Sequence, residues 1–122
     1  MAKTILIVDD SASIRQVVGI ALKGAGYSVI EGCDGQDALS KLTGQKVHLI
    51  ISDVNMPNMD GITFVKEVKK RAEYKFTPII MLTTEAGQDK MAEGKAAGAK
   101  AWVVKPFQPA QMLDAVAKLC LP

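Results

Sequence analysis

Short apolar runs that are typical of strands alternate along this chain with longer segments in which apolar residues recur at helical spacing. This order occurs five times in succession. The short runs predict strands at 4–8, 28–31, 47–52, 79–83 and 101–104. The run at 47–52 is apolar at successive positions, which is typical of a central parallel strand that is buried on both faces. A repeated strand–helix order predicts an α/β fold built on a parallel sheet.

Helix boundaries are marked between the strand-like runs. Asp34 and Asp60 stand where a helix start needs a side-chain acceptor, Pro109 suits a first turn, and Gly26 suits a helix end. Four stripes are expected to face the core: Ile14, Val17, Val18, Ala21, Leu22 and Ala25; Ala38, Leu39 and Leu42; Ile62, Val65, Val68 and Ala72; and Met112, Leu113, Val116 and Leu119.

The helix expected at 88–97 differs from the others. Its apolar residues are mainly Met91, Ala92 and Ala96, and Gly94 in its middle costs about 1 kcal/mol relative to alanine. We therefore expect this helix to be held loosely. With right-handed crossovers, the five units predict a flavodoxin-like (βα)5 doubly wound five-stranded parallel sheet with strand order 2-1-3-4-5. The length fits a single domain, residues 1–122, without an output domain.

Composition narrows the classes of partner. A net charge of +2 does not indicate a nucleic-acid-binding protein. Cys33 and Cys120 lie far apart without metal-ligand or redox spacing, so reduced thiols are expected. The chain shows no signal peptide and no apolar run of the ~20 residues needed to span a bilayer, which predicts a cytoplasmic protein. Five clustered basic residues are interpreted as a solvated helix face: Lys66, Lys69, Lys70, Arg71 and Lys75.

Polar residues end or follow four of the strand-like runs: Asp9, Asp10, Asp53, Thr83 and Lys105. The carboxyl ends of parallel strands share one edge, where open α/β sheets bind ligands. Three acids there predict a Mg²⁺ site, because magnesium prefers oxygen ligands and keeps several waters. A carboxylate in such a site can attack a phosphoryl group when the metal and a cation neutralise the charge that develops.

Each of these residues also has a purely structural interpretation. Lys105 would then pair with the acids, and Thr83 would be an ordinary strand-end hydroxyl. His48 stands at the opposite end of its strand, so it is not expected to bind metal or carry phosphate.

Four segments carry a resemblance to a known family: VDDS at 8–11, ISDVNMPNMDG at 51–61, MLTTEAG at 81–87 and VVKPF at 103–107. In this order, and across nearly the whole chain, they resemble the receiver domain of bacterial two-component response regulators, most closely its stand-alone chemotaxis members. The resemblance implies that Asp53 is the phosphoacceptor and Asp10 a direct magnesium ligand. It also implies that Asp9 acts mainly through a bound water and that Asn55 contributes its main-chain carbonyl.

Further roles follow from the resemblance. Lys105 would contact the phosphoryl group and Thr83 would turn toward it. Asn55 and Glu85 would border the path of the water that removes the phosphoryl group. Trp102 stands where the family usually has a smaller aromatic that swings inward. Its alternative is a half-buried residue at the sheet edge, and its size leaves the geometry of an inward movement open.

The implied function is phosphorylation-dependent signalling, not an enzyme acting on a separate substrate. The protein would take its phosphoryl group from a sensor histidine kinase of the chemotaxis type and would catalyse its own dephosphorylation. As a monomer it would then bind a partner, with the flagellar motor switch as the preferred target and a phosphatase as a further candidate. A phosphorelay intermediate or phosphate sink is the alternative. A haloacid-dehalogenase-type phosphatase is weaker, because the acids read Asp9-Asp10-Ser11 and not D-x-D-x-T.

Overall fold

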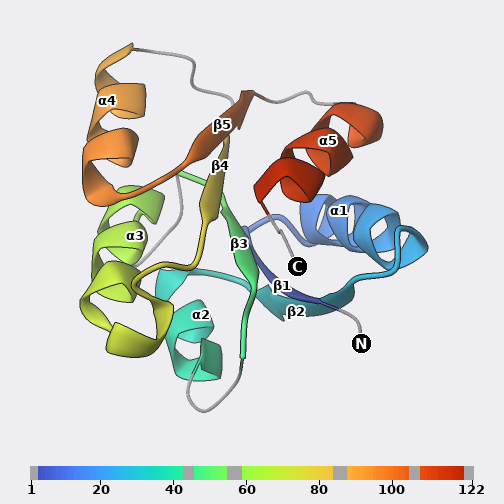
Figure 1. Ribbon diagram of the computed structural model, residues 1–122, viewed down its shortest axis with the longest axis horizontal. Coiled ribbons are helices and arrows are strands. Elements are labelled where there is room, and N and C mark those ends of the chain that lie inside the picture. The colour runs from blue at the N-terminus through green and yellow to red at the C-terminus, as the bar shows by residue number, and fades with distance from the viewer. Residues whose placement is uncertain (1–2, 43–45, 55–58, 84–87, 105–107, 120–122) are drawn as a thin grey trace.

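A computed structural model of the chain describes residues 3–42, 46–54, 59–83, 88–104 and 108–119, apart from the side chains at 83 and 88–91. The chain forms a five-stranded sheet between two layers of helices (Figure 1). The strands are β1 (Thr4–Val8), β2 (Ser28–Gly32), β3 (Leu49–Ser52), β4 (Ile79–Thr83) and β5 (Ala101–Val104). The helices are α1 (Ala12–Gly24), α2 (Gly35–Leu42), α3 (Gly61–Lys70), α4 (Gln88–Ala97) and α5 (Pro109–Leu119), with a 3₁₀ turn η1 at Ala72–Tyr74.

The strands are parallel and lie in the order β2-β1-β3-β4-β5, which confirms the predicted topology. Val8 pairs with Gly32 on one side and with Ser52 on the other, and Thr83 pairs with Val104. The carboxyl ends of neighbouring strands are therefore aligned at one edge of the sheet, and the residues that follow them start from that edge.

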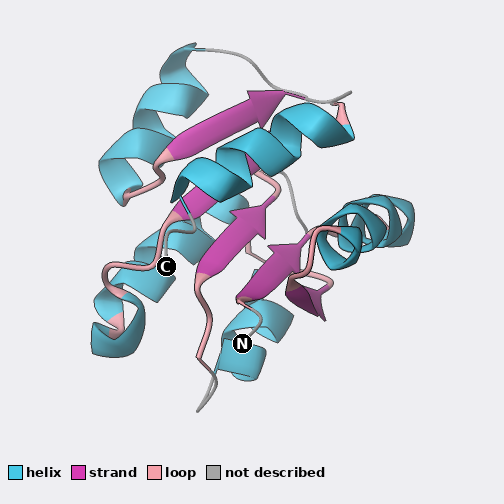
Figure 2. Cartoon of the chain, turned by 45° about the vertical axis from the view of Figure 1, so that its right-hand side comes forward, coloured by secondary structure: helices cyan, strands magenta, loops and turns pink. Residues whose placement is uncertain are grey.

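The sheet separates two hydrophobic cores. Helices α2, α3 and α4 cover one face and α1 and α5 cover the other, and the view in Figure 2 shows the strands between these layers. Phe64 is fully buried in the first core, and Leu22 and Val116 are fully buried in the second. All four residues of β3 are buried, as predicted for a central strand covered on both faces.

The predicted stripe of α1 was partly wrong. Val17 is 50% exposed, and Ala25 lies beyond the helix as its C-cap. The rest of the predicted stripe is confirmed, because Val18 and Leu22 are buried and Ile14 and Ala21 pack, partly buried, against the same core. The helix still ends where expected, because Gly26 adopts a φ of 97°, a left-handed conformation that favours glycine.

The predicted stripe of α3 was also too long. The helix ends at Lys70, and Ala72 is exposed. Arg71 leaves the helix in an extended conformation, and its guanidinium donates to the carbonyl of Leu39 over 3.1 Å. The buried position that follows is taken by Tyr74, whose hydroxyl donates to the carbonyl of Leu42.

The basic cluster is not a uniformly solvated face. Lys69 is partly buried, and its Nζ donates to the main-chain carbonyls of Lys75 and Thr77. Burial lowers the pKa of Lys69, and the nearby charge of Lys100 lowers it further. Lys69 and Arg71 therefore hold the end of α3 in place, and the interpretation of these two residues as solvated was wrong.

Strand β3 begins at Leu49, two residues later than predicted. His48, just before it, joins this end of the strand to Thr4 of β1. The His48 N–H donates to the Thr4 carbonyl over 2.8 Å, and His48 Nδ1 accepts the Thr4 N–H over 3.0 Å. Cys33 is a free, exposed thiol, and Cys120 lies outside the described residues. None of the helices in the described ranges is both long enough and apolar enough to cross a membrane.

Candidate functional site

Three carboxylates meet at the carboxyl edge of the sheet. Asp9 follows β1 and Asp53 follows β3, and both are buried, whereas Asp10 is exposed. Each residue offers one carboxylate oxygen, and these three oxygens lie within 4.8 Å of one another. Like charges this close repel unless a cation neutralises them, and hard oxygen donors suit Mg²⁺. The donor set therefore fits the magnesium ion expected from the sequence.

Asp53 is held rigidly by the main chain around it. Its N–H donates to the Val8 carbonyl over 2.9 Å, and its Oδ1 accepts the N–H of Val54 over 2.8 Å. A Cβ added at Gly61 would come within 2.0 Å of the Asp53 carbonyl oxygen. The first residue of α3 therefore has to be glycine, since only glycine lets the helix start so close to the Asp53 main chain.

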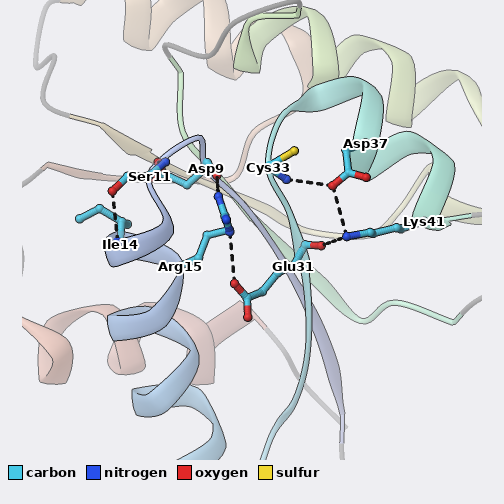
Figure 3. A network of polar contacts seen from close by, with 8 residues as sticks. All are labelled: Asp9, Ser11, Ile14, Arg15, Glu31, Cys33, Asp37 and Lys41. Atoms are coloured by element: carbon cyan, nitrogen blue, oxygen red, sulfur yellow. Dashed lines mark hydrogen bonds and ion pairs between the residues drawn. The ribbon is translucent and has the colours of Figure 1, made fainter.

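The turn that carries Asp9 is fixed in the same way (Figure 3). The Asp9 N–H donates to the Gly32 carbonyl over 3.1 Å. The Asp9 Oδ1 accepts the Ser11 N–H over 2.9 Å. Ser11 is the N-cap of α1, and its Oγ accepts the Ile14 N–H over 3.3 Å. Asp9 is thus anchored to β2 and to the start of α1, while Asp10 extends to solvent, where it can adjust to an ion.

Arg15 joins this turn to the neighbouring strand (Figure 3). Its Nη1 donates to the Asp9 carbonyl over 2.5 Å, and its Nε donates to Glu31 Oε1 over 3.2 Å. The Glu31 carbonyl in turn accepts from Lys41 Nζ over 2.5 Å. A chain of polar contacts therefore runs from the acidic cluster across β2 to α2.

Asp37 of α2 is the last residue in this series of polar contacts. Its Oδ2 accepts the Cys33 N–H over 3.0 Å and lies 3.2 Å from Lys41 Nζ. The hydrogen bond from the Cys33 main chain is the main cause that lowers the pKa of Asp37, and Lys41 adds to it. Asp37 therefore stays ionised and fastens the start of α2 to the end of β2.

The structure describes the remaining predicted site residues only in part. The main chain of Thr83 ends β4, but its side chain lies outside the description, as do the whole of Asn55, Glu85 and Lys105. Trp102 lies on β5 beside Met81 and packs, partly buried, against the core under α2, α3 and α4.

Two residues of the site were missed by the sequence analysis. Only one feature of the sequence indicated that Arg15 could reach the site: it is a basic residue one turn beyond the expected start of the first helix. Gly61 had a clearer one, since it directly follows the capping Asp60 at a position where a helix gains nothing from glycine.

Comparison with known proteins agrees with this geometry. Residues 5–117 match the family described as the response regulator receiver domain. The chain is 38% identical to "Chemotaxis protein CheY1" of Helicobacter pylori, over 86% of each chain. It is 34% identical to "Protein PilG" of Pseudomonas aeruginosa, over 92% of this chain and 83% of that one. A third relative, "Phosphate regulon transcriptional regulatory protein PhoB" of P. aeruginosa, is 36% identical over 93% of this chain, which spans about half of it (49%).

Solved structures extend the similarity to three dimensions. The chemotaxis protein CheY4 of Vibrio cholerae superposes with a TM-score of 0.94 at 50% identity, over 98% of this chain and 99% of that one. The receiver domain of sensor histidine kinase PA1611 from P. aeruginosa superposes with a TM-score of 0.90 at 27% identity, over 98% of each chain. That structure is described as having a magnesium ion coordinated in its active site cleft.

Proposed function

The chain belongs to the family of response regulator receiver domains, and from that premise we propose that Asp53 accepts a phosphoryl group from a phosphohistidine of a sensor kinase. The observation that carries this proposal is the convergence of three carboxylates within 4.8 Å at the carboxyl edge of the sheet. Asp53 is buried and fixed by main-chain hydrogen bonds, as a nucleophile that must meet its substrate in one orientation needs to be.

In the proposed reaction, an Asp53 carboxylate oxygen forms the bond to phosphorus while the bond between phosphorus and the imidazole nitrogen breaks. The electron pair of that bond stays on the leaving imidazole. Asp9, Asp10 and Asp53 would hold Mg²⁺, with the Asn55 carbonyl as a further expected ligand. When bound, the ion neutralises charge on the transferring oxygens. Lys105 is assigned to the same oxygens as a second positive charge.

The proposed readout begins at Thr83. Its hydroxyl is assigned to donate to the bound phosphoryl group, and Trp102 on the neighbouring strand is assigned to respond. The relatives described as chemotaxis proteins support a partner in that pathway, and we name the flagellar motor switch as the target and a phosphatase as a further partner. The protein is proposed to act as a cytoplasmic monomer that does not bind nucleic acid.

Removal of the phosphoryl group is assigned to water that passes Asn55 and Glu85. Small polar or acidic side chains can orient a water molecule there, whereas large or basic ones would block it. Replacing both residues by larger ones is expected to lengthen the life of the aspartyl phosphate. An unchanged lifetime would show that the water enters by another path.

A phosphorelay intermediate or phosphate sink is the second candidate. The observation that supports it is the structural similarity of the chain to the receiver domain of a sensor histidine kinase. A partner that binds only the phosphorylated protein would support the first candidate. Onward transfer to a second histidine, without any such partner, would support this alternative.

The central test is labelling by acetyl phosphate in the presence of Mg²⁺. Wild type is expected to incorporate one phosphoryl group per chain, and Asp53→Asn is expected to incorporate none while keeping its fold. Phosphorylation is expected to change the fluorescence emission of Trp102. Thr83→Ala should still be labelled but should lose most of this change in emission. Labelling of Asp53→Asn at the wild-type rate would contradict the assignment.

A further inference from the structure

The indole of Trp102 lies directly against the main chain of Gly94 in α4. A Cβ added at Gly94 would stand 2.8 Å from Trp102 Cζ3 and 3.5 Å from Cε3, with Met81 Cγ at 3.8 Å. Carbon atoms that are not bonded pack at about 3.5–4.0 Å, so the shortest of these distances is a clash. Position 94 therefore has no room for a side chain while the indole keeps this position.

The same contact lies where α4 meets the sheet. The sequence of α4 forms almost no apolar stripe, and its described side chains at 92, 93, 95 and 96 are exposed, whereas Gly94 is buried. Trp102 is one of the partly buried residues that pack against the core on this side. Among the described residues of α4, Gly94 meets β5 through its main chain, which lies against the indole ring of Trp102.

Glycine is a poor residue for the middle of a helix, because it loses the most backbone entropy and gives no side-chain packing. Its presence at position 94 is accounted for by the size of the residue opposite. Tryptophan is the largest side chain, and glycine is the residue that leaves space for it. The two positions are complementary in volume.

We propose that Gly94 is a positioning residue for Trp102, which sets the resting place of the indole and ties it to α4. Because the ring and the helix main chain share one contact, the indole changes rotamer only together with a displacement of α4. A partner that binds α4 would then sense the state of the indole. This last step rests on the proposed function, whereas the pairing of the two residues does not.

A double-mutant cycle tests the pairing without phosphate. The four proteins are wild type, Gly94→Ala, Trp102→Phe and the double variant, and urea unfolding is followed by circular dichroism. With Trp102 present, Gly94→Ala is expected to lower the unfolding midpoint. In the Trp102→Phe background the outer ring that reaches Gly94 is gone, so the same change is expected to raise the midpoint, because alanine favours the helix.

Gly24→Ala is the matched control. Gly24 is an exposed residue of α1, and apart from its chain neighbours and the main chain of its own helix, no atom lies within 4 Å of the place where its Cβ would stand. Its effect on the midpoint is expected to be the same with either residue at position 102. Equal effects of Gly94→Ala in the two backgrounds would overturn the pairing, and so would a failure of Gly94→Ala to fold in both.

Fluorescence tests the position of the ring, since Trp102 is the only tryptophan in the sequence. Gly94→Ala is expected to shift its emission to longer wavelength and to increase quenching by acrylamide, whereas Gly24→Ala leaves both unchanged. Magnesium with beryllofluoride, a phosphoryl mimic, should change the wild-type emission beyond the effect of magnesium alone. That change should be smaller in Gly94→Ala.

The outcomes separate the pairing from the proposed function. If wild type does not respond to beryllofluoride but the double-mutant cycle shows coupling, the readout fails and the pairing stands. If wild type responds and Gly94→Ala gives the same emission and the same response, the indole is not positioned by Gly94 and the inference is wrong.

Discussion

The guanidinium of Arg15 donates a hydrogen bond to the main-chain carbonyl of Asp9 over 2.5 Å, from one turn into α1 back to the acidic cluster. The side chain of Arg15 is only 17% exposed, and its second contact is to Glu31, whose side chain is 46% exposed. A charged hydrogen bond to a carbonyl at a partly buried site stabilises more than an ion pair in contact with water. The two contacts of Arg15 therefore differ in strength.

Arg15→Ala is expected to lower the free energy of unfolding by about 1–2 kcal/mol, because the Asp9 carbonyl loses its charged donor. Glu31→Gln is expected to lower it by no more than about 0.5 kcal/mol, because an exposed pair contributes little. Urea unfolding in the presence of a chelator measures both. If Glu31→Gln were as damaging as Arg15→Ala, the ion pair and not the carbonyl contact would be the stabilising part.

Asp10→Asn separates metal binding from folding. Asp10 is exposed, and its carboxylate lies within 4.8 Å of those of Asp9 and Asp53. Without metal, removing its charge relieves repulsion, so we expect stability in chelator to rise by up to about 1 kcal/mol. With Mg²⁺, the wild type should gain stability through binding, and the variant should gain much less.

A matched control for Asp10→Asn is Asp114→Asn, which removes the same charge from an exposed position on α5. It is expected to change neither the stability in chelator nor the gain with Mg²⁺. If Asp10→Asn kept the full gain with Mg²⁺, Asp10 would not be a ligand.

Gly61→Ala tests the close approach of α3 to the acceptor. Its Cβ would stand 2.0 Å from the Asp53 carbonyl oxygen and 2.8 Å from the Val54 Cα. Both obstacles are main-chain atoms, so no side-chain rotation relieves them. We expect a loss of more than about 3 kcal/mol in stability, or a displaced Asp53 with slower phosphorylation. Unchanged stability together with unchanged labelling would show that the helix start can move away freely.

Several features of the site could be read from the sequence because they depend on local signals and a general rule. Short apolar runs between turn residues located the strands, and parallel strands place their carboxyl ends at one edge, so Asp9, Asp10 and Asp53 could be expected to meet. The caps Asp34 and Asp60 were equally local. Their side chains accept N–H groups of the first turns of α2 and α3 over 2.8 Å.

Other features depend on contacts between distant residues. The end of α3 is set by the contact of Arg71 with Leu39, 32 residues earlier, and apolar spacing cannot report such a contact. Arg15 meets Glu31 only because β2 lies beside β1. To predict the pairing of Gly94 with Trp102, one must know which face of α4 lies against β5. The sequence of α4 does not indicate this face, because its apolar residues form almost no stripe.

His48 gives the last prediction, a dependence of stability on pH. Its Nδ1 accepts the Thr4 N–H over 3.0 Å, which requires the neutral ring. Burial, and then the charges of Lys3 and Lys46, lower its pKa from the usual 6.5. The folded protein therefore binds a proton at His48 less readily than the unfolded chain does. The stability due to His48 is complete above pH 6.5, and it is lost as the pH falls below that value toward the folded pKa.

The test compares wild type with His48→Asn in urea unfolding between pH 8 and pH 5. Asparagine Oδ1 can take the place of Nδ1 as the acceptor for Thr4 but does not titrate. Below pH 6.5 the wild type should lose stability relative to the variant, by at most about 1.4 kcal/mol per pH unit for one proton. Above pH 6.5 the difference between them should be constant. Asp37, whose pKa is lowered from 3.8, loses its contribution only in more acidic solution, so it does not disturb this range. Parallel pH profiles for the two proteins would show that His48 is not held in its neutral form by the contact with Thr4.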